Sequence, residues 1–191
     1  MMPAKSLGVS FIVYILLAGC TGDAGRRADE TPDSGQHPML ASGDDMGATS
    51  TFSDVAEGTP FTYTTLPVCV DGEGTIEVTT VAPIDDQNIT IKRFAVVESA
   101  DGILGADYAP MEELGIDPEV TVVTRPCDED KGPALVAVEL VRTGATTGWS
   151  DGFEVHYEAG DSEATTTVHV KVVLCAPGDE MTQDCSIAPT P

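Results

Sequence analysis

Basic side chains are scarce in this chain. It has 9 Lys and Arg residues against 32 Asp and Glu residues, so its formal net charge at pH 7 is -23. Binding of nucleic acid or of anionic lipid headgroups needs Lys and Arg to neutralise phosphates. The charge balance therefore argues against both as partners. It is typical of a surface kept soluble by self-repulsion, and it leaves open an acidic face for a cation or a basic partner.

Several signatures of catalysis and cofactor binding are also missing. The sequence has no H-E-x-x-H pair, glycine-rich phosphate loop or dinucleotide fingerprint. Of its three histidines, His37 falls in a polar segment, and His156 and His169 take outward positions in a predicted hairpin. Neighbouring carboxylates such as Glu112 and Glu113 are expected by chance among 32 acidic residues. We predict no enzyme activity, no cofactor and no metal site.

No apolar run is long enough to cross a membrane, which takes about 20 residues. The N-terminal run extends only from Leu7 to Leu17, after the basic Lys5, and small residues follow it. These are the parts of a secretory signal peptide, which we predict for residues 1–19. Its removal would leave a side-chain charge of -24, because Lys5 is its only charged residue.

The run closes on Leu17-Ala18-Gly19-Cys20, which resembles the lipobox of bacterial lipoproteins. The resemblance implies that Cys20 is lipidated, becomes the mature N-terminus and anchors the chain at the extracytoplasmic face of the cell membrane. Two or more acyl chains hold a protein stably there, at about 0.8 kcal/mol per buried CH₂. Because Thr21 rather than Asp follows, the resemblance implies outer-membrane sorting in an organism with two membranes.

The chain has five cysteines, so pairing in disulfides leaves one thiol free unless that cysteine carries another modification. If Cys20 carries lipid, Cys69, Cys127, Cys175 and Cys185 remain, and in an oxidising compartment four cysteines most simply form two disulfides. No C-x-x-C pair indicates a metal site instead. We favour Cys175 with Cys185, which closes a short polar loop, and hence Cys69 with Cys127. The alternative joins Cys69 to Cys175.

Large apolar residues are almost absent from residues 21–54. Such a segment cannot bury enough surface to offset its ordering entropy, so we predict that residues 20–57 are the lipidated cysteine and a flexible tether. A coil of about 34 residues spans roughly 30–35 Å, enough to hold a domain clear of the headgroups. Residues 178–191 are predicted to form a C-terminal tail.

Aromatic residues make up only 5% of the chain, so a core in residues 58–177 must be built mainly from Val and Ile. Alternation of apolar and polar residues, with Asp-Gly and Gly-Asp turns, predicts an all-β antiparallel sandwich of about seven strands. A slip in the alternation at Lys92-Arg93 predicts a bulge, and residues 110–114 before Gly115 predict a helical turn. The predicted strands are 61–66, 76–79, 89–96, 120–124, 136–140, 153–157 and 168–172.

The layout, with a Val-Cys segment at residues 68–70 and Val172-Val173-Leu174-Cys175 near the end, resembles immunoglobulin-like domains of uncharacterised exported actinobacterial proteins. The resemblance covers about residues 58–177 and implies an immunoglobulin-like fold without a known activity. The chain departs from true immunoglobulin domains in its only tryptophan, Trp149, which lies in a turn-like Gly148–Gly152 stretch. Trp149 is a candidate contact for a partner, or it covers the end of the core.

The last two predicted strands form the clearest hairpin. If their apolar faces pair inward, the register is constrained, because a slip by one residue would turn every apolar side chain outward, whereas a slip by two residues keeps them inward. The predicted pairs are Phe153 with Val172, Glu154 with Lys171, Val155 with Val170, His156 with His169 and Tyr157 with Val168. Two histidines are too few for a structural metal site, so we predict this register without a metal.

Two classes of function remain. The first is a surface-tethered, non-catalytic interaction or envelope-structural module with an unknown protein or envelope partner. The second is a lipoprotein that binds a cation or a small ligand through its acidic surface. An exposed apolar patch around Trp149 would favour the first, and a closed pocket with converging carboxylates would favour the second.

Overall fold

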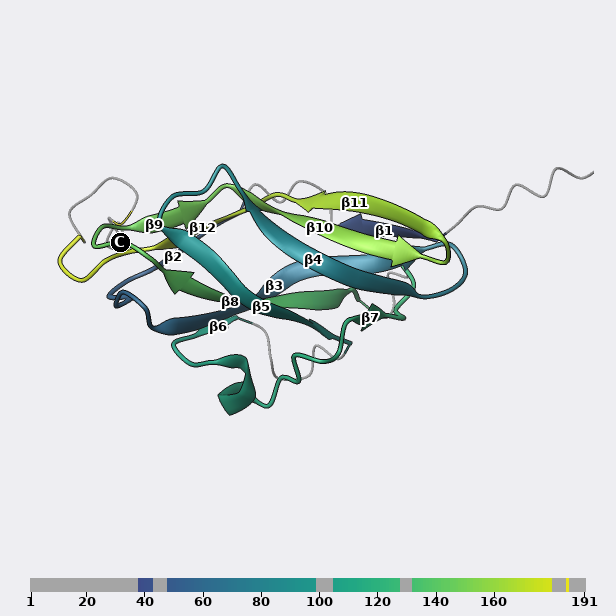
Figure 1. Cartoon of the computed structure of the whole chain (residues 1–191), viewed down its shortest axis with the longest axis horizontal. Coiled ribbons are helices and arrows are strands. Elements are labelled where there is room, and N and C mark those ends of the chain that lie inside the picture. The colour runs from purple at the N-terminus through teal and green to yellow at the C-terminus, as the bar shows by residue number, and fades with distance from the viewer. Residues whose placement is uncertain (1–37, 43–47, 99–104, 128–131, 180–184, 186–191) are drawn as a thin grey trace, which may run out of the picture. The chain divides into compact units, whose positions relative to one another are not determined.

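The computed structural model describes residues 38–42, 48–98, 105–127, 132–179 and 185. Within these ranges the chain forms twelve strands and one short 3-10 helix. Antiparallel sheets pack against each other, with β4, β10 and β11 above β3, β5 and β8 in Figure 1. The predicted all-β sandwich is therefore confirmed. The predicted signal peptide, Cys20 and His37 lie outside the described residues.

The first sheet has the strand order β1-β3-β8-β5, and β6 also pairs with β3. All of its neighbouring strands are antiparallel. The register shifts between Ile91 and Arg93 where β5 pairs with β8, which confirms the predicted bulge. The strands are β1 (Met39–Ser42), β3 (Pro60–Asp71), β5 (Ile89–Val97), β6 (Ala106–Asp107) and β8 (Ala134–Arg142).

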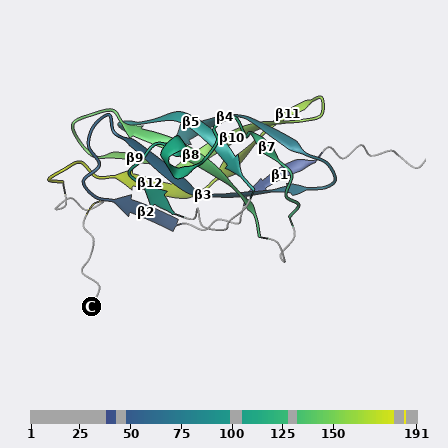
Figure 2. The same ribbon diagram turned by 90° about the horizontal axis from the view of Figure 1, so that it is seen from below.

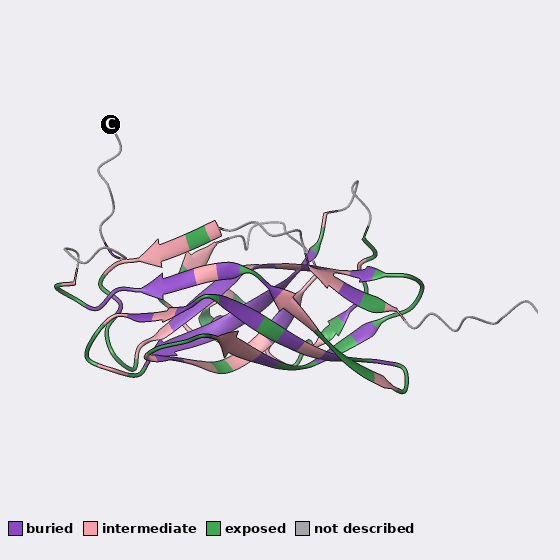
Figure 3. Cartoon of the chain, turned by 90° about the horizontal axis from the view of Figure 1, so that it is seen from above, coloured by how far each residue is buried: buried purple, intermediate pink, exposed green. Residues whose placement is uncertain are grey.

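The second sheet has the order β11-β10-β4-β7, and a third, smaller sheet has the order β2-β12-β9. β2 runs parallel to β12, whereas the other pairs are antiparallel. Figure 3 looks onto the second sheet from outside, and buried and exposed residues alternate along β10. The remaining strands are β2 (Ala48–Phe52), β4 (Ile76–Ile84), β7 (Val122–Val123), β9 (Gly148–Ser150), β10 (Gly152–Ala159), β11 (Ser162–Val168) and β12 (Val170–Leu174).

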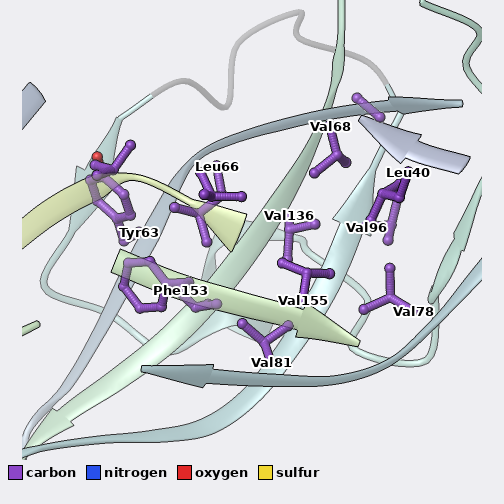
Figure 4. Packing of buried hydrophobic residues seen from close by; sticks show 14 of the residues in the cluster. Leu40, Tyr63, Leu66, Val68, Val78, Val81, Val96, Val136, Phe153 and Val155 are labelled. Atoms are coloured by element: carbon purple, nitrogen blue, oxygen red, sulfur yellow. The ribbon is translucent and has the colours of Figure 1, made fainter. Parts of the chain in front are cut away.

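A core of Val, Leu and Ile with a few aromatic rings lies between the sheets. In Figure 4, Phe153 and Val155 of β10 lie among side chains of the facing sheet such as Leu66 and Val136. Each fully buried side chain of this kind contributes about 1.5–3 kcal/mol of transfer free energy. Phe61 and Phe153 are among the largest fully buried side chains, so rings near the centre supply volume that Val cannot.

The central strand β8 is buried on both faces, along all 9 of its residues. Its inner side chains join the core, and its outer side chains lie under the 3-10 helix η1 (Met111–Leu114). Met111 packs on the small side chains of Ala95 and Ala137, and Figure 2 shows η1 against this sheet. The predicted helical turn is confirmed, and Gly115 ends it with φ 74°.

The predicted tether, residues 20–57, is wrong at its C-terminal end, because β1 and β2 lie within it. Leu40 of β1 is buried in the core, and the ring of Phe52 at the end of β2 packs at a tilt against that of Phe61, with ring centroids 4.6 Å apart. Both strands are held mainly by backbone pairing with β3 and β12. Composition did not predict them because such pairing needs few apolar side chains. Residues 20–37 lie outside the described residues.

The predicted register of the last hairpin is wrong by four residues. β10 pairs with β11, so that Phe153 lies opposite Val168 and His156 opposite Thr165. A two-residue connection, in which Gly160 has φ 63°, fixes this register. The apolar residues after His169 belong to β12, which pairs with β2 and β9 instead. The polar strand β11 has no clear alternation of apolar and polar residues, so it was not predicted.

Candidate interaction surfaces

Both disulfides have the favoured connectivity. Cys69 is bonded to Cys127, with Cα atoms 4.9 Å apart, and Cys175 to Cys185, with Cα atoms 5.9 Å apart. The prediction from the short loop is confirmed, and the alternative Cys69–Cys175 pair is excluded. Cys20 is the only cysteine that these two bonds do not use. Its lipidation stays a prediction.

Trp149 lies in strand β9 and not in a turn, which corrects the reading of the Gly148–Gly152 stretch. Its half-buried ring packs beside the Cys175–Cys185 disulfide. Its Nε1 donates a hydrogen bond to Gln87 Oε1 at 3.2 Å, and Lys171 Nζ lies 5.0 Å from the ring centroid. The indole therefore covers the second disulfide and Val173, and not the end of the main core.

An open polar groove of about 530 Å³ lies on the outer face of the second sheet. Its centre is His156, whose Nδ1 is 2.9 Å from Thr165 Oγ1 and whose Nε2 is 3.8 Å from Glu154 Oε2. The groove is lined by Thr79, Thr80, His156, Tyr157, Glu158, Glu163, Ala164 and Thr165.

Three carboxylates form a row across this face. Glu158 of β10 is directly opposite Glu163 of β11 and Glu77 of β4. Like charges that face each other across strands repel and destabilise the pairing. Among the described residues, however, no group of three His, Cys, Asp or Glu side chains is placed to hold a metal ion. This face is acidic, but its side chains form no ligand set.

A second groove, of about 380 Å³, lies between strands β4 and β5, which face each other at the side of the sandwich. Apolar side chains of Val81, Ile91, Phe94 and Pro118 line it together with Thr80, Lys92 and Arg93. Ile91 and Phe94 also pack against the core. The sequence predicted only a bulge at Lys92-Arg93 here, and no groove. At this bulge the Lys92 side chain is exposed to solvent, whereas Arg93 contacts the buried Glu139.

Arg93 is already used by the fold. Its Nε donates to the buried Glu139 Oε2 at 3.1 Å, and its Nη1 pairs with Glu112. Burial lowers the pKa of Arg93, but the hydrogen bonds and charges of Glu139 and Glu112 outweigh it, so the pKa lies above its usual value. The same Glu139 oxygen accepts from Met111 N at 3.0 Å and fixes η1 on β8. The Arg93 side chain is therefore held in place by these two carboxylates where it lines the groove.

Lys92 differs from the other basic residues that the structure describes. It is exposed, and no carboxylate of the described residues lies in ion-pair distance of its amine. By contrast, Lys171 pairs with Asp151 at 3.2 Å, and Arg125 pairs with Glu98 at 3.6 Å. Arg142 is buried on backbone carbonyls. Lys92 is thus the one described cation available to an outside group.

The chain matches no protein-family model, no curated protein and no solved structure with which it was compared. Among the residues that the structure describes, no helix has the length and apolar character needed to cross a membrane. Any function must therefore be argued from the chain's own residues and surfaces.

Proposed function

We propose that this chain is a bacterial lipoprotein, anchored through Cys20 at the extracytoplasmic face of the membrane, whose β-sandwich is a non-catalytic interaction or envelope-structural module. One observation carries the proposal. The two disulfides use four of the five cysteines, and the one left over is the cysteine at the end of the lipobox-like sequence. Disulfides persist in oxidising, extracytoplasmic compartments, which is where a lipobox would direct the chain.

The strand order supports the immunoglobulin-like part of the proposal. If β1, β3, β4, β5, β8, β10 and β11 are taken as strands A to G, the first sheet has the order A-B-E-D and the second has the order G-F-C. Immunoglobulin constant-type domains divide their strands between two sheets in this way. The disulfides depart from that pattern, because neither joins β3 to β10.

The alternative, cation binding through the acidic surface, has less support. The carboxylate row of Glu77, Glu158 and Glu163 supplies negative charge, but the described side chains do not converge on a common point. A non-catalytic role is supported by the surroundings of Ser150. Gly148–Gly152 matches the G-x-S-x-G pattern of hydrolases, but Ser150 is buried in β9, and its Oγ donates to the backbone carbonyl of Gly152 at 2.6 Å.

The test is the chemistry of the mature N-terminus. The full chain is expressed in a bacterial host, and its N-terminal peptide is analysed by mass spectrometry. We expect cleavage before Cys20 and a mass increase from the attached acyl chains, and Cys20→Ser should abolish both. The matched control, Cys175→Ala with Cys185→Ala, removes two other cysteines and should stay lipidated. An unmodified Cys20, or cleavage at another bond, would disprove the anchor.

A further inference from the structure

We propose that the groove between β4 and β5 binds an extended, acidic peptide segment of a partner protein by strand addition. The inference rests on the proposed role as an interaction module and names the surface and the partner chemistry for it. In strand addition, backbone hydrogen bonds give affinity and alternate side chains enter pockets that give specificity. Four features of the groove support this occupant.

First, the chain itself fills the adjacent part of this gap with an extended segment. Val96 N of β5 donates to Val120 O at 2.7 Å, and Val78 N of β4 donates to Thr121 O at 2.9 Å. β7 continues the pairing with β4. The two strands are therefore spaced so that one extended chain can bond to both. This segment leaves the gap at Pro118, where the groove begins.

Second, the backbone of both strands faces the groove. Ile84 O of β4 accepts a hydrogen bond from Asp151 N on the β10 side. The backbone N–H and C=O groups of successive residues in a strand point to opposite sides, so those of Val81, three residues earlier, point away from β10. Val96 N points away from β8 toward Val120, so Phe94, two residues earlier, presents its N–H and C=O to the same side. Among the described residues, β5 pairs only with β8, and β4 beyond Val78 pairs only with β10.

Third, the groove is apolar where side chains of an added strand would enter. Val81 is buried in the core, while Ile91 and Phe94 are only partly covered. An apolar side chain inserted between them would remove more of this surface from water, at about 25 cal/mol per Å². Val120, one of the few exposed large hydrophobic residues, belongs to the segment that already fills the gap.

Fourth, the charge at the rim selects the partner. Lys92 has no carboxylate partner among the described residues, although the protein carries 32 acidic side chains. Arg93 is occupied by Glu112 and Glu139. A carboxylate on the added strand would pair with Lys92, whereas a basic segment would meet the same charge. The partner is therefore an extended segment with apolar residues on both sides of an acidic one.

Lysine, proline and bulges on an edge strand also protect proteins from unwanted pairing. Lys92, the bulge beside it, and Pro83 on β4 belong to this set. Pro83 has no N–H, so the edge of β4 offers pairing groups at Val81 but no donor two residues later. This limits the groove to a short segment. Pure protection and selective binding predict different effects of changing Lys92.

The experiment uses the purified, full lipoprotein in detergent micelles and three synthetic peptides. The first is acetyl-Thr-Val-Asp-Val-Thr-amide, the second has Lys in place of Asp, and the third has Pro in place of the second Val. Binding is measured by calorimetry, and the site by amide hydrogen exchange. The protein variant is Lys92→Glu, and Lys171→Glu is its control, because it changes the net charge equally on another strand.

We expect the Asp peptide to bind and to slow exchange at Val81 and Phe94, and the Pro peptide to do neither. Lys92→Glu should weaken the Asp peptide about fivefold, the upper end of what one exposed ion pair contributes, and should favour the Lys peptide. Lys171→Glu should change neither preference. Equal binding of the Asp and Lys peptides, absence of binding, or protection away from β4 and β5 would overturn the proposal.

Self-association of Lys92→Glu without peptide binding by the parent protein would mean that Lys92 only protects the edge, and would also overturn the proposal. Failure of lipidation at Cys20 would leave these peptide results unchanged. The proposed anchor and the proposed groove can therefore fail separately.

Discussion

The two disulfides should stabilise the domain by different routes, and removing each pair separately will show this. A disulfide restricts the unfolded chain more when it closes a longer loop. Cys69 and Cys127 are 58 residues apart, and Cys175 and Cys185 are 10 apart. The loop-closure relation then gives about 4 kcal/mol for the long loop and about 2.7 kcal/mol for the short one at 25 °C.

The packing around each disulfide also affects how much unfolding free energy its removal costs. Cys69 is half-buried and Cys127 is exposed, so Cys69→Ala with Cys127→Ala removes little besides the cross-link. Cys175 and Cys185 are both 1% exposed and pack with Trp149, so their double alanine variant also loses buried contacts. We therefore expect each double variant to lose about 3–5 kcal/mol of unfolding free energy. The total loss does not separate the two mechanisms.

The denaturant dependence does separate them. Urea unfolding of each variant is followed by circular dichroism, and the slope m reports the surface exposed on unfolding. Loss of the long cross-link should raise m clearly, because the unfolded chain expands. Loss of the short cross-link should leave m nearly unchanged, because it constrains only a small loop. Equal m values for both variants, or no rise without Cys69–Cys127, would refute the argument from the unfolded state.

Two further substitutions test how the strands are held. Gly148→Ala should lower the free energy of unfolding, measured in urea, by about 3 kcal/mol, because a Cβ there would lie 2.5 Å from the Asn88 carbonyl oxygen. A loss below about 1 kcal/mol would show that the backbone moves to make room for the Cβ. Glu139→Ala should cost about 2–3 kcal/mol and speed amide exchange at Met111, since the buried carboxylate binds Arg93 and that amide. Its exposed neighbour on the same guanidinium, Glu112, is the control, and Glu112→Ala should cost less than about 1 kcal/mol; equal losses would contradict the role of the buried carboxylate.

Local patterns in the sequence predicted features that depend on neighbouring residues. Phe153, Val155 and Tyr157 alternate along one strand, and the structure buries all three. The slip at Lys92-Arg93 predicted the bulge in β5, because one extra residue interrupts a period of two. The low entropic cost of a 10-residue separation predicted Cys175–Cys185, and the other bond followed by elimination.

The errors concern strands that are held by the backbone. β2 is a run of Ala, Thr and Ser before Phe52, and it looks like a linker until it lies beside β12. β11 is equally polar because it sits at the edge of its sheet. Its absence from the prediction moved the apolar residues after His169 onto the wrong partner. The partner of a polar strand is set by the geometry of distant segments, so its own composition does not reveal it.

The groove between β4 and β5 also combines features that the sequence predicted with features that depend on distant segments. The sequence determined that this is a strongly acidic chain with alternating strands, four cysteines suited to two disulfides and a lipobox-like N-terminal segment. Only the tertiary structure decided that Arg93 is bound by Glu139, that Lys92 has no carboxylate partner among the described residues and that both border an apolar gap. The physical reason is the distance in sequence between the residues that interact. Alternation and loop closure involve residues close together along the chain, whereas ion pairing and the space between two sheet edges depend on residues far apart in sequence.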